Sequence, residues 1–237
     1  MAGIAGFFSD PLGAGQSVDC GDALAISRLC YQFPVGSGFT ATIGARVRQD
    51  EMLAAWPSVY PSDTMIDFFT YAGAPGAYST VLGAGVGLMY TSPGGFSASL
   101  NYVSANADNG NPSGAANPTL GGGVMTQASQ ESFTAQLGYI VKNWGVALAY
   151  TFAQNVGFNG TTLAGLNGAF GSFGTGNGFS SATGYSTNSF ALGAFWQPED
   201  SGWIPSVSVG WGYNNYSFPS GTTFANSPLT GTPVSQS

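Results

Sequence analysis

Large apolar side chains alternate with small or polar ones along eight stretches of the chain. Between Phe39 and Arg48, the odd positions carry Phe, Ala, Ile, Ala and Val, whereas the even positions carry Thr, Thr, Gly, Arg and Arg. A period of two is typical of a β-strand whose two faces have different surroundings. The pattern predicts strands over residues 26–33, 39–48, 78–90, 96–102, 132–140, 144–152, 189–196 and 206–214.

The two faces of these strands differ in an unusual way. The apolar face carries most of the large side chains and no charged residue, and the other face is mostly Gly, Ser, Thr, Asn and Gln. A soluble sheet usually places Lys and Glu on its wet face, so this composition favours contact between the apolar face and lipid. Aromatic rings near strand ends indicate girdles at two membrane interfaces. We assign to them Tyr31, Phe33, Phe39, Tyr90, Tyr139, Trp144 and Trp196 near short turns, and Tyr102, Tyr150 and Tyr213 near long loops.

The connections between the predicted strands alternate between short and long. Residues 34–38, 91–95 and 141–143 are tight turns, whereas residues 49–77, 103–131 and 153–188 are long loops. Transmembrane barrels have short periplasmic turns and long outer loops, and their closure leaves no unpaired strand edge in lipid. We therefore expect an all-β fold, a transmembrane antiparallel up-and-down β-barrel to which this chain contributes about eight strands.

Composition and charge exclude several other classes of protein. Charged residues make up 6% of the 237 residues, against roughly a quarter in soluble domains. The net charge of −7, with only four basic residues, excludes a nucleic-acid binder, which needs a basic surface. No stretch approaches the ~20 apolar residues of a membrane helix. A membrane span must therefore consist of strands.

The residues that usually carry enzyme chemistry are missing or out of place. The chain has no histidine, which removes His-based acid–base pairs, Ser-His-Asp triads and most zinc sites. Cys20 and Cys30 are incidental or form a loop disulfide, and neither has a base to activate it. Gly83, Gly85 and Gly87 lie inside a strand and not at the strand-to-helix turn of a dinucleotide site. We expect no enzyme activity, no cofactor and no metal.

Three of the four basic residues gather on one predicted hairpin. Arg46 and Arg48 share the polar face of one strand, and the turn at 34–38 brings Arg28 close to Arg46. An arginine that faces lipid costs about 2–4 kcal/mol at the bilayer midplane, so these side chains must face water. If the following loop bends into the barrel, its carboxylates oppose the arginines and form a selective constriction; the alternatives are a solvated outer loop and a short helix over residues 62–70. The candidate pore-lining residues are Arg28, Arg46, Arg48, Asp50, Glu51, Asp63 and Asp67.

Several stretches also carry a family resemblance. They are Ile26–Pro34, Ile43–Asp50, Trp56–Pro61, Phe69–Tyr78, Asn101–Asn106 and Phe195–Pro198. In these stretches the chain resembles the cyanobacterial outer-membrane porins of the OprB-like family, which includes carbohydrate-selective and iron-uptake porins. The resemblance implies a barrel of about 16 strands, preceded by a signal peptide and a periplasmic S-layer-homology domain. Neither is recognisable in this sequence, and residues 230–237 do not form a typical closing strand, so we expect an internal part of the barrel.

The residues and the resemblance lead to one functional expectation. We expect an integral outer-membrane porin, a water-filled channel for passive diffusion of small hydrophilic solutes: ions, with sugars and inorganic iron as further candidates. Its expected partners are outer-membrane lipid, the solutes and two further copies in a homotrimer, with no nucleic acid. The alternative is a structural or adhesive outer-membrane barrel, closed with about eight strands and filled by side chains.

Overall fold

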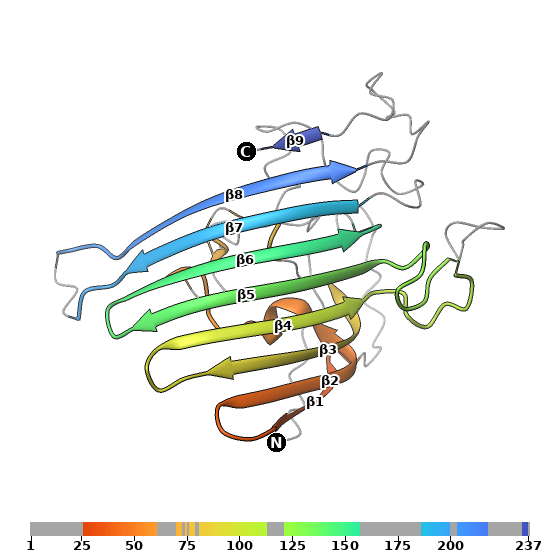
Figure 1. The fold of residues 1–237 in the computed structure, drawn as a ribbon, viewed down its shortest axis with the longest axis horizontal. Coiled ribbons are helices and arrows are strands. Elements are labelled where there is room, and N and C mark those ends of the chain that lie inside the picture. Colours follow the sequence, from red (N-terminus) through yellow and green to blue (C-terminus); the bar gives the residue numbers. More distant parts are fainter. Residues whose placement is uncertain are drawn as a thin grey trace, which may run out of the picture.

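A single antiparallel sheet contains all the strands that the structure describes. The structure is a computed structural model that describes residues 26–60, 70–72, 74, 76–78, 81–112, 121–156, 186–199, 203–217 and 234–236. Each strand pairs with its neighbours in chain order, which gives an up-and-down topology (Figure 1). The strands are β1 (Leu29–Pro34), β2 (Phe39–Arg48), β3 (Leu82–Thr91), β4 (Phe96–Ser104), β5 (Glu131–Val141), β6 (Trp144–Gln154), β7 (Ser186–Trp196), β8 (Val207–Ser217) and β9 (Val234–Gln236).

The sheet has two edges and is arched. The first and last strands in the pairing order lie at opposite edges, and β9 pairs with β8 only opposite residues 214–216 (Figure 1). The prediction of an all-β, antiparallel, up-and-down sheet is confirmed. The described strands are not closed into a barrel, because β1 and β8 have no pairing with one another. A small barrel closed by these eight strands does not fit this arrangement.

The eight predicted strands are all present, with shifted ends. The largest shift is at the start of β3, which begins at Leu82 and not at residue 78. Shifts of three residues occur at the starts of β1 and β7 and at the end of β8. Before β3, Tyr78 is almost completely buried in a cluster on the concave side of the sheet. The chain before Leu82 therefore follows the packing of Tyr78 and does not extend the strand.

A β-bulge breaks the alternation of β2. The register against β3 shifts between Gly44 and Val47, where three steps along β2 face two steps along β3, from Gly85 to Gly83. Such a bulge adds one residue to a strand and turns the following side chains to the other face. The expectation that Val47 shares the apolar face with Ile43 is therefore wrong: Val47 is fully buried with Met52 and Val103.

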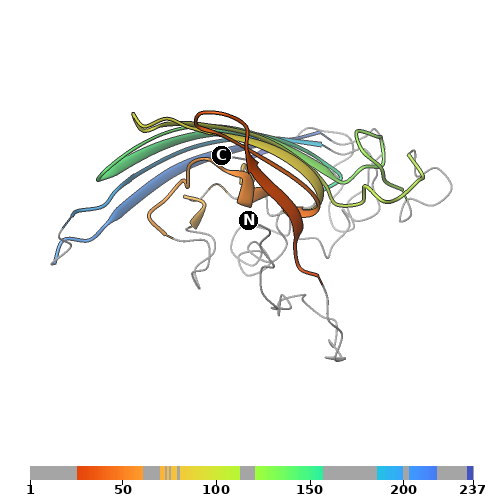
Figure 2. The same cartoon turned by 90° about the horizontal axis from the view of Figure 1, so that it is seen from below.

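The large apolar side chains of the sheet lie on its exposed face. The most exposed of them have exposed fractions between 41% at Leu88 and 61% at Val209, and others, such as Phe133 and Phe152, are half-buried. The opposite face is concave, and the segment after β2 folds back onto it (Figure 2). Small and polar residues of that face are buried, among them Ser99, Asn101, Thr134, Gln136 and Thr151. Burial is thus the reverse of what a water-soluble sheet shows.

Candidate functional site

The segment that crosses the concave face is the main structural element of the candidate site. We call it the strap: the described part of residues 49–78, which begins with the 3-10 helix η1 (Gln49–Met52). Near its start, the amide of Gln49 donates to the carbonyl oxygen of Val81 at 2.9 Å. At its far reach, the amide of Val59 donates to Ser208 Oγ of β8 at 3.1 Å. The strap therefore extends from the end of β2 across to β8.

Glycines of the strands let the strap approach the sheet closely. A Cβ atom on Gly87 would lie 2.6 Å from the sulfur of Met52, and one on Gly193 would lie 3.0 Å from the carbonyl oxygen of Pro57. A Cβ on Gly138 of β5 would overlap the Ala55 side chain. Cβ atoms essentially never lie under 3.0 Å from such neighbours. The small residues of the concave face therefore leave room for the strap to pack directly against the strands.

Side-chain amides bind the strap backbone to the sheet. Gln136 of β5 accepts from the Ala55 amide at 3.1 Å and donates to the Ala55 carbonyl oxygen at 2.7 Å. Gln49 Nε2 donates to Asn101 Oδ1 at 3.0 Å and to Thr134 Oγ1 at 2.9 Å. These groups are buried, and an unmet buried hydrogen-bonding group costs about 1–3 kcal/mol. The contacts therefore fix the position of the strap on the sheet.

The returning half of the strap forms an apolar cluster with β6 and β7. Tyr71, Ala74, Ala77 and Tyr78 pack against two alanines of the strands, Ala149 and Ala191. The rings of Tyr71 and Tyr78 stack with centroids 6.0 Å apart. Burial raises the pKa of Tyr78 to about 12, and the nearby Gln136 side chain opposes this shift. Within the described residues, the Tyr78 hydroxyl makes no hydrogen bond of good geometry. Tyr78 therefore anchors the strap through its ring.

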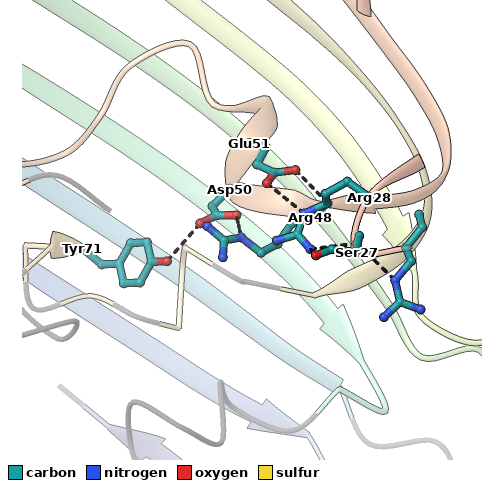
Figure 3. Close-up of polar contacts among 7 residues, drawn as sticks. Ser27, Arg28, Arg48, Asp50, Glu51 and Tyr71 are labelled. Atoms are coloured by element: carbon teal, nitrogen blue, oxygen red, sulfur yellow. Dashed lines mark hydrogen bonds and ion pairs between the residues drawn. The ribbon is translucent and has the colours of Figure 1, made fainter. Parts of the chain in front are cut away.

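Ion pairs join the hairpin of β1 and β2 to the start of the strap (Figure 3). Arg28 Nε lies 2.9 Å from Glu51 Oε1, and Arg48 Nε lies 2.6 Å from Asp50 Oδ1. The Asp50 carboxylate also accepts a hydrogen bond of 3.1 Å from the hydroxyl of Tyr71. Burial raises the pKa of the Asp50 carboxyl above its usual value, although Arg48 opposes this shift. Asp50 thus connects β2 with the returning half of the strap.

The structure brings five of the seven candidate pore-lining residues together. Arg28, Arg46 and Arg48 lie around η1, which carries Asp50 and Glu51. From the sequence we expected carboxylates that face the arginines across an opening. In the structure, Asp50 and Glu51 instead form direct ion pairs with Arg48 and Arg28 beside them. The difference arises because η1 follows β2 directly and turns onto the concave face at once. Asp63, Asp67 and Cys20 lie outside the described residues.

The predicted girdle residues lie on the exposed face and are partly or fully accessible. Tyr31, Tyr139, Trp144 and Trp196 are exposed, and the rings of Tyr139 and Trp144 meet across a turn at 5.6 Å. Phe39 and Tyr90 form another ring pair across β2 and β3, with centroids 4.6 Å apart. The remaining girdle residues are half-buried: Phe33, Tyr102, Tyr150 and Tyr213.

Sequence reasoning missed the residues that hold the strap. Gln49, Met52 and Gln136 carry close contacts between the strap and the sheet, yet none belongs to a recognisable motif. The available signal was the series of glycines and small residues on one face of the strands. Cys30 is a free, half-buried thiol that packs against the cluster of Val47, Met52 and Val103.

Comparisons with known proteins add no assignment. Neither the scan against protein-family models nor the search of curated proteins returned a match. Separately, no helix in the described part of the chain is long and apolar enough to cross a membrane.

Proposed function

We propose that this chain forms part of the wall of an outer-membrane porin, a passive channel for small hydrophilic solutes. The reversed burial of the sheet carries the proposal. An exposed face made of large uncharged side chains across eight strands is unfavourable in water, because a contiguous apolar surface of this kind drives association or membrane binding. The exposed face is stable in contact with the hydrocarbon of a membrane. The polar concave face then lines the water-filled channel.

The free edges of the sheet support a larger barrel. In hydrocarbon, each unmet backbone polar group costs several kcal/mol, so a lipid-embedded sheet must close on itself. We propose that further strands continue the sheet from β1 and from the opposite edge, where β9 pairs with part of β8, giving a barrel of about 16 strands. The strap then lies on the inner wall and narrows the opening, with the arginine cluster at its start.

The proposed partners follow from the same arrangement. Outer-membrane lipid surrounds the exposed face, and the solutes are small and polar, with no requirement for a cofactor or for catalysis. Association into a homotrimer is part of the proposal. Cross-linking of the protein in detergent, followed by mass measurement, tests it.

Reconstitution into planar lipid bilayers tests the channel itself. We expect stepwise increases of current when the purified protein is added, and swelling of liposomes in solutions of small sugars. The second candidate, a structural barrel without an open pore, is favoured by one observation: the strap covers much of the concave face. Insertion into the bilayer without conductance would support that candidate, and recovery of the protein only in the aqueous fraction would contradict both.

A further inference from the structure

The three arginines of the β1–β2 hairpin differ in how their charge is compensated. Arg28 and Arg48 each have a carboxylate partner, Glu51 and Asp50. Arg46 donates from Nε to the carbonyl oxygen of Ser27 at 3.2 Å. Among the described residues, no carboxylate forms an ion pair with Arg46. Within the described part of the chain, the Arg46 guanidinium is therefore compensated by a backbone carbonyl dipole and by no carboxylate.

Arg46 lies beside Arg28 on the strap side of the hairpin. Nη1 of Arg28 donates to the same carbonyl oxygen of Ser27 at 3.0 Å, so the two guanidinium groups share one acceptor. Arg28 in turn contacts Glu51 of η1 (Figure 3). Counted over the described residues, two positive groups thus accompany one carboxylate here, an excess of one positive charge in this part of the cluster.

The β-bulge explains why Arg46 is accessible. Arg46 lies within the register shift between Gly44 and Val47, and its side chain is exposed. A fixed, exposed guanidinium attracts anions and repels cations. For unit charges about 4 Å apart in water, the attraction corresponds to about a fivefold change in local ion concentration. The carboxylate partners of Arg28 and Arg48 reduce the attraction of these two arginines for an anion.

We propose that Arg46 is a selectivity-determining residue of the channel and that it favours small anions over cations. This inference rests on the proposed channel function. It differs from a general role for the three arginines, since Arg46 is the one of the three that has no carboxylate partner among the described residues. Arg28 and Arg48 hold the strap in place through their carboxylate partners.

Reversal potentials across a KCl gradient test the proposal on the purified protein in planar bilayers. For R46Q we expect the anion-to-cation permeability ratio to fall about two- to fivefold at low salt. R46K keeps the charge and should keep the ratio. The double variant R28Q/E51Q removes one charge of each sign and should change the ratio by less than half as much as R46Q.

A matched control and a measurement on the unchanged protein complete the test. Lys142 lies in the turn between β5 and β6, pairs with Glu199 and is far from η1 along the strands, so K142Q should leave the ratio unchanged. In the unchanged protein, anion preference should weaken between 0.1 and 1 M salt, as the screening length falls from about 10 Å to about 3 Å. Cation preference in the unchanged protein, or an unaltered ratio in R46Q channels of normal conductance, would overturn the assignment and leave the channel standing. No conductance from any variant, the unchanged protein included, would instead refute the proposed function.

Discussion

The two faces of the sheet bury opposite kinds of side chain. The outer face carries Leu100, Leu137 and Leu148, which are about half exposed and touch little else. The inner face carries Asn101, Gln136 and other polar side chains that are almost fully buried under the strap. The amides of Asn101 and Gln136 are buried where the strap supplies hydrogen-bond partners, and the leucines are exposed where we expect lipid in place of water. Each face therefore predicts a different response to substitution.

Loss of Gln136 is expected to have the largest effect on stability. Gln136→Leu leaves both the amide and the carbonyl oxygen of Ala55 without their partner in a buried place, at about 1–3 kcal/mol for each group. Denaturant unfolding of the protein in detergent micelles measures the change. Gln32 is the control: it lies on β1, is exposed, and makes one side-chain hydrogen bond of 3.2 Å to Thr42. Gln32→Leu should change stability by no more than about 0.5 kcal/mol, and equal losses in both variants would show that the strap is not held as described.

A charged residue introduced on the outer face tests whether that face contacts lipid or water. Leu148 is half exposed, so Leu148→Arg creates no cavity and would be tolerated by a sheet in water. In a bilayer we expect a loss of about 2–4 kcal/mol when the arginine lies near the midplane. Unfolding of the protein in lipid vesicles measures this difference. Val124→Arg, at an exposed position between β4 and β5, is the control and should be nearly neutral. If Leu148→Arg is also neutral, the outer face does not meet hydrocarbon.

Extra volume under the strap should also destabilise the protein. In Gly138→Ala, the new methyl group meets the side chain of Ala55 and lies 2.7 Å from Ser97 Oγ. Overpacking of this kind typically costs about 1–3 kcal/mol. Gly94 lies in a turn where the nearest atom to an added Cβ is Ser92 Oγ at 3.7 Å. Thermal unfolding should therefore show a lower midpoint for Gly138→Ala than for Gly94→Ala, and equal midpoints would mean that the strap yields freely.

The outer face was easier to predict from the sequence than the inner one. Alternation is a local property, so residues such as Leu88 and Leu100 could be placed on one face from their neighbours alone. The strap depends on contacts between distant residues: Ala55 and Gln136 are 81 positions apart. The β-bulge at Ala45 and Arg46 was also invisible, because both residues continue the alternating pattern. Non-local packing thus decided where Val47 and Tyr78 lie.

Tyr78 provides the smallest expected effect and separates ring packing from hydroxyl chemistry. The ring is buried in the cluster with Tyr71, whereas the hydroxyl lies near the Gln136 side chain and makes no hydrogen bond of good geometry within the described residues. Tyr78→Phe keeps the ring and removes a buried group that lost its contact with water, so at pH 7 it should be neutral or stabilising by less than about 1 kcal/mol.

Burial raises the pKa of Tyr78 to about 12, whereas a tyrosine in the unfolded chain has a pKa near 10. The neutral phenol therefore contributes stability that is fully present below pH 10 and is lost as the pH rises towards 12. Unfolding measured from pH 8 to 12 should show a steeper alkaline loss in the unchanged protein than in Tyr78→Phe. Parallel curves would mean that the hydroxyl reaches water when the strap is in place, and the close packing of the inner face would then need revision.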